Sequence, residues 1–327
     1  MTSVNLTGKS VLVTGGAGFI GSNLVESLLE NGANVTVLDN FETGKLANIQ
    51  AFLNNPNFKL IEGDIRDIHT CELAVKGCEM ISHQAALGSV PRSIAHPELT
   101  HSVNATGFLN VLNAARKEGI KRFVFASSSS VYGDSQISPK TIGSEGDLLS
   151  PYAVTKKLNE DYAKVFHKLH NMQTIGLRYF NVFGPKQDPY GVYAAAIPKF
   201  IEKLTKGEEV IINGDGNQTR DFTFVTNAVN ANLLGLTTTN VGCFGNVYNV
   251  ACGAYYTLND VVSVIKKGLA TRNKLHPEFI VTHGPERAGD IRNSLAEISL
   301  TKEELGYGNP VSFEDGMNQY LSSMFQL

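Results

Sequence analysis

Residues 11–22 read VLVTGGAGFIGS, and this stretch predicts a buried strand, a tight turn and a helix in that order. Apolar residues recur at helical spacing after the turn, at Phe19, Ile20, Leu24, Val25 and Leu28. Such a turn lets the backbone approach a pyrophosphate, which then lies at the positive end of the helix. We therefore expect Gly15, Gly18 and Gly21 to form a dinucleotide-binding turn. An ordinary strand-to-helix turn is the alternative, because glycine spacing alone is a weak signal.

The composition is typical of a soluble globular enzyme or binding protein, with 42% hydrophobic and 18% charged residues among 327. A net charge of −3 and scattered basic residues predict no nucleic-acid surface. No apolar run is long enough to cross a bilayer and no secretory pattern precedes the first strand, so we expect a cytoplasmic protein with no membrane contact. The four cysteines form no CxxC pair and the eight histidines lack metal-binding spacing, so we expect no metal.

A second apolar strand at residues 35–38 ends at Asp39, at the distance from the glycines that dinucleotide-binding folds use. A carboxylate at this place accepts hydrogen bonds from the ribose hydroxyls of adenosine and repels a 2′-phosphate. The pattern therefore favours NAD over NADP. A turn or helix-capping aspartate is the alternative.

Further strands are expected at residues 58–61, 80–82, 123–126 and 174–177, with helical patterns between them. This alternation predicts an α/β fold with a doubly wound parallel sheet of the Rossmann type and ligands at the carboxyl ends of the strands. The residues that follow these strands, and so are expected at that edge, are Asp64, Ile65, Gln84, Ala85, Ala86, Ser127 to Ser130, Tyr179 and Asn181.

The regular alternation weakens beyond Gly184, which predicts a dinucleotide-binding domain over residues 1–183 and a smaller domain over 184–327. The segments expected in the second part are a helix at 194–205, a strand at 221–225, a helix from Asn227, a strand at 246–250 and a helix capped by Thr257. We expect the segment near 221–245 to cross back onto the first domain.

Tyr152 and Lys156 lie four residues apart on a predicted helix, so their side chains share one face. A nearby ammonium stabilises a phenolate, and an oxidised nicotinamide adds to this, which lowers a tyrosine pKa from about 10 towards neutrality. Two unrelated surface residues are the alternative reading. The serines at 127–130 end the fifth expected strand, which precedes the helix that carries Tyr152 and Lys156. Hydroxyl groups at this edge of the sheet can orient a substrate alcohol.

Taken together, TGGAGFIG, Asp39, the serine run and YAVTK resemble the extended short-chain dehydrogenase/reductase family over nearly the whole chain. The resemblance implies a Rossmann domain with bound NAD and a smaller sugar-nucleotide domain. It also implies Ser128 as the catalytic hydroxyl, with Ser129 as the alternative, Tyr152 as the base and Lys156 as its activator. The cofactor contacts that it implies, besides those above, are Phe19, Ile20, Asn40, Phe41, Thr43, Gly44 and Asn104.

The segments HQAALGSVPRS, RYFNVFGP, INGDGNQTRDF and ERAGDIRNS resemble those of the UDP-N-acetylglucosamine 4-epimerases within this family. This resemblance places Asn181 and Arg220 on the uridine diphosphate, Arg287 on a phosphate and Asp290 near the uridine ribose. Paired arginines suit a diphosphate because of their charge and fork geometry. The other substrate contacts that the resemblance implies are Gly88, Ser89, Arg92, Ser129, Gln187, Tyr193 and Ala195.

Two departures narrow the reaction that the resemblance implies. Related dehydratases and decarboxylases carry a carboxylic acid just before Val131, where this chain has Ser129 and Ser130. Epimerases restricted to unacetylated hexoses carry a tyrosine at the place of Ser294, so a larger pocket that admits an N-acetyl group is expected.

Three alternatives stay open at this point. The sugar can be a uronic acid, in UDP-glucuronate or the uronate of UDP-N-acetylglucosamine, or it can be the glucose of UDP-glucose. A nucleotide-binding sensor without turnover is the alternative from another class, because fold does not imply function. The resemblance also implies a homodimer through the helices around 104–117 and 152–169.

Overall fold

The fold is built on a seven-stranded parallel sheet in the order β11-β6-β5-β4-β1-β2-β3. The computed structural model describes residues 4–190, 194–285 and 292–325. The strands of this sheet are β1 (Ser10–Thr14), β2 (Asn34–Asp39), β3 (Phe58–Glu62), β4 (Met80–His83), β5 (Arg122–Ser128), β6 (Gln173–Tyr179) and β11 (Asn246–Val250). The strand order reverses at β1, which is where such sheets open a ligand crevice. The predicted doubly wound α/β fold is confirmed.

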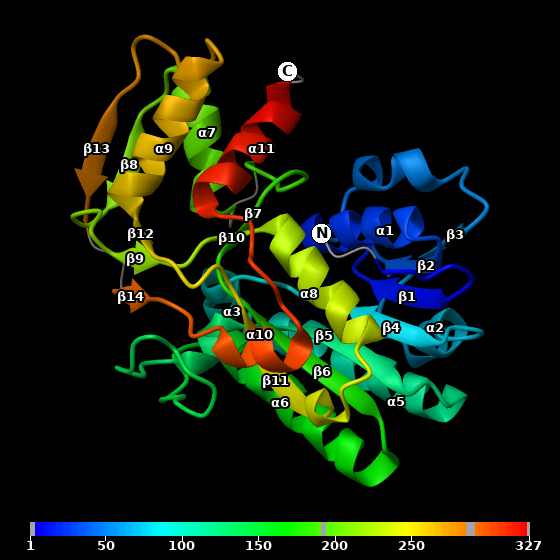
Figure 1. Ribbon diagram of the computed structural model, residues 1–327. Helices are drawn as coiled ribbons and strands as arrows, with labels where there is room; N and C mark the ends of the chain where they lie inside the picture. Colours follow the sequence, from blue (N-terminus) through cyan, green and yellow to red (C-terminus); the bar gives the residue numbers. More distant parts are fainter. Residues whose placement is uncertain (1–3, 191–193, 286–291, 326–327) are drawn as a thin grey trace.

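Helices cover both faces of the sheet (Figure 1). One face carries α1 (Phe19–Glu30) and α8 (Val225–Thr237), and the other carries α2 (Ile68–Ala74), α5 (Phe108–Glu118) and α6 (Pro151–His170). Leu24, Val25 and Leu28 of α1 are fully buried, as their helical spacing predicts. Burying each such side chain contributes roughly 1.5–3 kcal/mol, so this face holds α1 and its glycine turn firmly on the sheet.

Short segments connect the larger elements at the edges of the sheet. These are α3 (Val90–Ala95), α4 (Pro97–His101), the π-helical turn η3 (Ser102–Gly107) and the single turns η1 (Leu46–Asn48), η2 (Gln50–Phe52), η4 (Ser129–Tyr132) and η5 (Val241–Cys243). The π-helical turn precedes α5 directly and carries Asn104, one of the predicted cofactor contacts.

A smaller unit with its own apolar core contains much of the chain after residue 195 (Figure 1). Its helices are α7 (Ala196–Lys206), α9 (Leu258–Thr271) and α11 (Phe313–Phe325), and α10 (Ser299–Leu305) packs near β11. Its strand pairs are β8 (Val210–Asn213) with β13 (Val281–Gly284), β7 (Val182–Phe183) with β10 (Thr223–Phe224), and β9 (Thr219–Arg220) with both β12 (Tyr256–Thr257) and β14 (Asn293–Ser294). Thr257 caps α9 through a capping box, as predicted.

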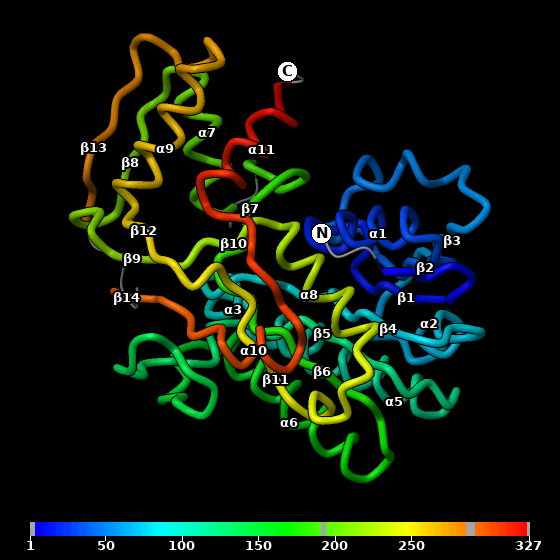
Figure 2. Tube along the Cα trace, viewed as in Figure 1, coloured from blue at the N-terminus to red at the C-terminus, as the bar shows by residue number. Residues whose placement is uncertain are grey.

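The chain returns to the large sheet after its first excursion into the smaller unit, as the trace in Figure 2 shows. Helix α8 packs against α1 and β5, and β11 then pairs with β6 in parallel. The buried carboxylate of Asp221 accepts hydrogen bonds from the backbone N–H groups of Cys252, Gly253 and Ala296. One side chain thus joins three chain segments that run between the sheet and the smaller unit.

The strand predicted over residues 221–225 is wrong in its extent. Only Thr223–Phe224 form a strand, and α8 begins at Val225, two residues before the predicted start at Asn227. The physical reason is that Asp221 turns inward to satisfy backbone donors from other segments, which no local pattern records. The helix predicted at 194–205 is found at 196–206.

Candidate active site

The glycine turn between β1 and α1 is shaped by close backbone contacts. Gly15 has φ +68°, and a Cβ on it would lie 2.7 Å from the Cα of Ala85. A Cβ on Gly21 would lie 2.1 Å from the carbonyl oxygen of Gly15. Gly18 is the N-cap of α1 and has no side chain to cap it. The first turn of the helix can therefore offer its backbone N–H groups to an anion.

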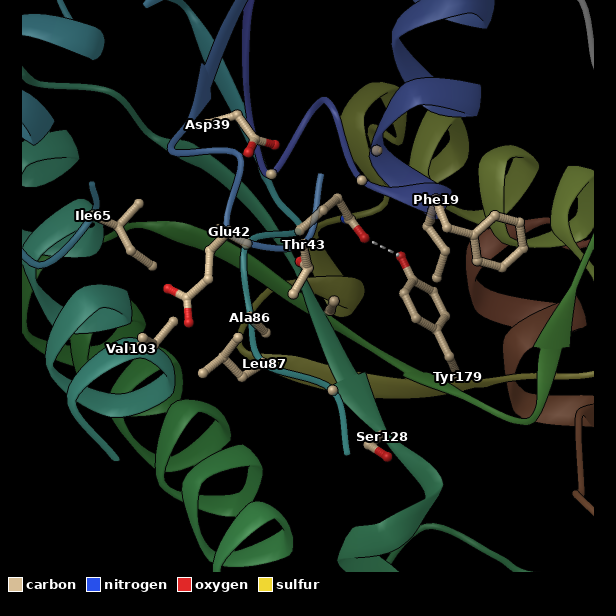
Figure 3. A pocket seen from close by; sticks show the side chains of 18 of the residues that line it. Phe19, Asp39, Glu42, Thr43, Ile65, Ala86, Leu87, Val103, Ser128 and Tyr179 are labelled. Carbon is tan, nitrogen blue, oxygen red and sulfur yellow. Dashed lines mark hydrogen bonds between the residues drawn. The ribbon is translucent and has the colours of Figure 1, made fainter. Parts of the chain in front are cut away.

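A cavity of about 470 Å³ opens beside this turn, at the carboxyl ends of the central strands. Figure 3 shows Asp39 and Ser128 at opposite ends of it, with Ala86 and Leu87 between them. The predicted cofactor contacts that line it are Gly15, Gly18, Phe19, Ile20, Gly21, Asp39, Asn40, Thr43, Asp64, Ile65, Gln84, Ala85, Ala86, Tyr152, Lys156 and Tyr179. Residues far apart in the sequence thus meet around one elongated space.

Asp39 ends β2 and binds two backbone groups. Its carboxylate accepts hydrogen bonds from the N–H groups of Ala17 and Phe41, each at 2.8 Å. Burial raises the pKa of Asp39, and these two donors oppose that rise. A Cβ on Gly44 would lie 2.9 Å from this carboxylate. The Phe41 N–H thus orients the Asp39 carboxylate, and residue 44 has no room for a side chain beside it.

Asn104 supports the loop after β4 from the π-helical turn. Its side-chain carbonyl accepts a hydrogen bond from the N–H of Leu87, and its amide donates to the carbonyl of Leu87 and the hydroxyl of Thr155. These bonds join the cavity wall at Leu87 to helix α6. π-Helical turns of this kind occur often at functional sites.

Tyr152 and Lys156 lie on the first two turns of α6 and reach the end of β5. Ser150 caps the helix by accepting a hydrogen bond from the N–H of Ala153 at 3.1 Å. The Nζ of Lys156 donates to the carbonyl oxygen of Ala126 at 2.8 Å and lies 5.9 Å from the ring centre of Tyr152. Ser128, two residues beyond Ala126, also lines this end of the cavity, and its hydroxyl acts to lower the pKa of Tyr152. The predicted hydroxyl, phenol and ammonium thus converge on one end of the cavity.

Burial shifts the pKa values of both Lys156 and Tyr152. Burial lowers the pKa of Lys156 to about 8. Burial also raises the pKa of Tyr152, opposed by the Ser128 hydroxyl. Burial thus outweighs the opposing contact, so the chain by itself does not lower the Tyr152 pKa. A further positive charge in the cavity is needed to favour the phenolate.

Several lining residues are missed by the sequence reasoning. The Tyr179 hydroxyl donates to the side-chain carbonyl of Gln84 at 3.1 Å (Figure 3) and accepts from the amide of Asn232 at 2.7 Å. Asn232 belongs to α8, and no local signal connects it with Gln84. Asn232 does not itself line the cavity. The lining residues that are absent from the predicted cofactor and substrate contacts are Leu38, Glu42, Gly63, Leu87, Val103, Ala126, Ser127 and Val182. Glu42 had a usable signal, since it lies between the predicted contacts Phe41 and Thr43.

The predicted substrate contacts are more widely distributed. Gly88, Ser128 and Asn181 line the cavity, and the Asn181 amide donates to the carbonyl of Asp221. Arg220 and Ser294 are register partners on β9 and β14. The remaining positions are Ser89 at the N-cap of α3, Arg92 within α3, Ser129 in η4, Gln187 after β7 and Ala195 at the N-cap of α7. Tyr193, Arg287 and Asp290 lie outside the described residues.

Two absences hold for residues 4–190, 194–285 and 292–325. These residues contain no group of three or more His, Cys, Asp or Glu side chains placed to hold a metal ion. Among the same residues, no helix combines the length and the apolar character that a bilayer crossing requires.

The fold and the site together define a class: dinucleotide-dependent α/β enzymes with a serine, a tyrosine and a lysine at the carboxyl edge of the sheet. Residues 11–251 match the NAD dependent epimerase/dehydratase family, and the chain belongs to this family. Its cofactor is NAD, as predicted. The cavity has features that NAD requires, namely a glycine cradle that a Cβ would fill and a buried carboxylate at one end.

Similar proteins are nucleotide-sugar enzymes. A putative UDP-glucose 4-epimerase of Methanocaldococcus jannaschii is 35% identical over 96% of this chain and 98% of its own. A UDP-N-acetylglucosamine 4-epimerase of Methanobrevibacter ruminantium, solved with UDP-N-acetylmuramic acid, has a TM-score of 0.89 and 36% identity over 98% of this chain and 100% of that one. A UDP-glucuronic acid 4-epimerase of Bacillus cereus, solved with UDP-glucuronic acid and NAD, has a TM-score of 0.87 and 29% identity over 97% and 99%.

Proposed function

We propose that this enzyme interconverts UDP-N-acetylglucosamine and UDP-N-acetylgalactosamine by inverting C4 of the sugar through a 4-keto intermediate. The observation that carries the proposal is the convergence of Ser128, Tyr152 and Lys156 at one end of the cavity, opposite Asp39. NAD held between these ends by the glycine turn and Asp39 would supply the chemistry that accepts the C4 hydride and gives it back, so the reaction would have no net redox change.

In this mechanism the protein moves one proton and holds the sugar. The Tyr152 phenolate takes the proton from O4 as the C4 hydrogen leaves, and returns it to O4 of the product. The Ser128 hydroxyl orients O4, and the Lys156 ammonium supports the phenolate. The sugar presents its other face after turning about its bond to the diphosphate. We assign the diphosphate to Asn181, Arg220 and Arg287, which would hold the diphosphate while the 4-keto sugar turns.

The N-acetyl group is the finer part of the proposal. Ser294 is the register partner of Arg220 on the neighbouring strand, so the small side chain lies beside the proposed diphosphate contact. A serine there leaves more room than a tyrosine would. The 36% identical UDP-N-acetylglucosamine 4-epimerase supports the same assignment by similarity. We propose the smaller unit as the sugar-nucleotide domain and assign Asp290 to the uridine ribose.

Two other substrates have specific support. A uronate is supported by Arg92, which follows the cavity-lining Gly88 by four residues and carries a positive charge that can pair with the sugar carboxylate. A UDP-glucuronic acid 4-epimerase is also among the similar structures. UDP-glucose has the support of the 35% identical relative. A sensor without turnover has less support, because the three groups needed for proton transfer are all in place.

We also propose a cytoplasmic homodimer that serves polysaccharide biosynthesis. Helix α6 leaves Val154 and Val165 about half exposed and Leu169 70% exposed, which is an apolar surface that a second copy could cover. Analytical ultracentrifugation checks this proposal: a dimer is expected, and Leu169→Glu should shift it towards monomer. A parent protein that sediments as a monomer contradicts it.

The deciding experiment compares UDP-N-acetylglucosamine, its uronic acid and UDP-glucose in parallel with purified enzyme and no added oxidant. The C4 epimer of UDP-N-acetylglucosamine should form with the highest kcat/KM. A higher value with either other substrate changes the assigned sugar. Enzyme that carries NAD but yields no epimer from any of the three would favour the sensor instead.

A further inference from the structure

Helix α6 presents a third polar residue, Glu160, on the same face as Tyr152 and Lys156. The three residues are spaced four apart, so they lie on successive turns. The carboxylate of Glu160 accepts a hydrogen bond from the Ser127 hydroxyl at 2.5 Å. Ser127 lies between Ala126, whose carbonyl binds Lys156, and Ser128, whose hydroxyl acts to lower the pKa of Tyr152. The face of α6 therefore contacts three consecutive residues of β5, at 126–128.

Glu160 is itself held from behind by Arg178 of β6. The Arg178 Nε donates to one carboxylate oxygen and its Nη2 to the other, both at 2.8 Å. The other Nη of Arg178 pairs with Glu145, and the guanidinium lies 4.8 Å from the ring centre of Tyr132. Arg178 and Glu160 are 2% and 6% exposed. This bidentate geometry leaves the carboxylate one orientation, in which it reaches Ser127.

A buried ion pair of this kind is a poor source of stability, because desolvation of both charges offsets their attraction. Its position suggests a different role. Glu160 lies one helical turn after Lys156 on α6, next to the proposed proton-transfer residues, and has no part in the proton transfer itself. An ion pair that served only to pack α6 against the sheet could lie at any point along the helix. This one is connected through Ser127 to the two β5 residues that act on Lys156 and Tyr152.

We propose that Glu160 is a positioning residue for the Tyr152 base: clamped by Arg178, its carboxylate fixes the end of β5 against α6 and keeps a negative charge beside Lys156. This inference rests on the proposed role of Tyr152. Ser127 transmits the positioning, and the carboxylate charge supports the ammonium.

Among the residues that the structure describes, the charged and titratable groups around Lys156 come from two elements. Tyr152 and Glu160 face it from its own helix, and His83 faces it from β4. His83 is neutral at physiological pH, since burial lowers its pKa to about 3. Glu160 opposes the fall in the Lys156 pKa that burial causes. Loss of the Glu160 charge should therefore deprotonate Lys156 at lower pH and weaken its support for the Tyr152 phenolate.

The test uses holoenzyme purified with its NAD and three variants. Glu160→Gln removes the charge and keeps the shape, and Ser127→Ala removes only the contact to β5. Glu145→Gln is the matched control, because it also takes one carboxylate from Arg178 but does not touch Ser127 or Lys156. Phenolate absorbance is titrated with pH, and Tyr152→Phe identifies the component that belongs to Tyr152 among the 11 tyrosines. Epimerase kcat and KM are measured alongside.

Glu160→Gln should move the Tyr152 component to higher pH by about one unit and lower kcat by about tenfold, with KM within about twofold. Ser127→Ala should lower kcat by about threefold or more and leave that component in place. Glu145→Gln should match the parent in both. A Glu160→Gln protein with the parent's titration and kcat overturns the proposal, as does a Glu145→Gln protein with the same shift.

Two further outcomes separate the failure of this proposal from that of the proposed function. If Glu160→Gln does not fold, an unchanged kcat in Ser127→Ala overturns the positioning role. A parent titration with no component that Tyr152→Phe removes overturns Tyr152 as the base, and the role of Glu160 with it. A component that Tyr152→Phe removes but that Glu160→Gln leaves at the parent's pH overturns the role of Glu160 alone.

Discussion

The ammonium of Lys45 lies 2.8 Å from the carboxylate of Asp188, and this ion pair joins the loop after β2 to the loop after β7. The first loop lines the cavity through Thr43, and the second leads into the smaller unit. A second ion pair, between Lys186 and Glu26 at 2.7 Å, attaches the same loop to α1. These two ion pairs thus connect the loop after β7 to the loop after β2 and to α1, the helix that follows the glycine turn.

The ion pair between Lys45 and Asp188 should slow the release of bound NAD. Protein purified without added cofactor should carry NAD, since the proposed reaction regenerates it in every cycle. Lys45→Asp should release NAD faster, by up to about fivefold, because an exposed pair contributes at most about 1 kcal/mol. The double variant Lys45→Asp with Asp188→Lys should restore the parent rate. Stopped-flow release of NAD into a scavenging enzyme measures it, and a double variant as fast as the single one contradicts this role of the ion pair.

Replacing the proposed base, Tyr152, should slow turnover strongly and leave NAD bound. Tyr152→Phe removes only the hydroxyl, and we expect kcat to fall by about 10²–10⁴-fold because proton transfer is lost. Tyr162→Phe on the same helix is the control, since Tyr162 packs on the apolar core and should leave kcat near the parent value. NAD content and epimerase rate are measured for both. Full activity in Tyr152→Phe disproves the assignment.

The glycine turn should tolerate no side chain at residue 21. The Cβ of Gly21→Ala would lie 2.1 Å from the Gly15 carbonyl oxygen, so the turn must open. We expect the free energy of unfolding to fall by roughly 1–3 kcal/mol and bound NAD to be lost. Gly308→Ala is the control, because nothing lies within 4 Å of its Cβ position. Urea unfolding and NAD content report both effects, and a Gly21→Ala protein with normal NAD content contradicts the contact geometry.

His83 should make the fold sensitive to mild acid. It is buried beside Phe108 and hydrogen-bonded to the Thr14 hydroxyl at 2.9 Å, and burial lowers its pKa to about 3. The pKa of His83 in the unfolded chain is about 6.5. Below that pH the imidazole is protonated in the unfolded chain but stays neutral in the folded one, so the free energy of unfolding falls as pH falls.

Between about pH 7 and about pH 5 this one group should cost about 2 kcal/mol of unfolding free energy. Urea titrations at both pH values measure it in the parent and in His83→Asn, which lacks the titrating ring. The variant is expected to be less stable overall but to lose less on acidification. An equal loss in both proteins shows that His83 is not the responsible group.

The local parts of the fold could be predicted from the sequence because each depends on neighbouring residues. Glycine sterics and apolar spacing predict β1, the turn and α1, and the β-α alternation predicts the first six strands. The spacing of Tyr152 and Lys156 likewise determines that they share a helix face. The predicted helix capped by Thr257 is found for the same reason, since a capping box lies within four residues.

What the tertiary structure alone decided is which distant residues meet. The return of the chain near 221–245 was expected from the sequence, but the pairing of β11 with β6 and the contact of Asn232 with Tyr179 depend on long-range packing. The direction of the Lys156 ammonium, and the clamp of Arg178 on Glu160, depend on how α6 packs across β5 and β6. Sequence thus determined the elements and their chemistry through local sterics and periodicity. Only long-range packing decided how burial and charge act on those groups.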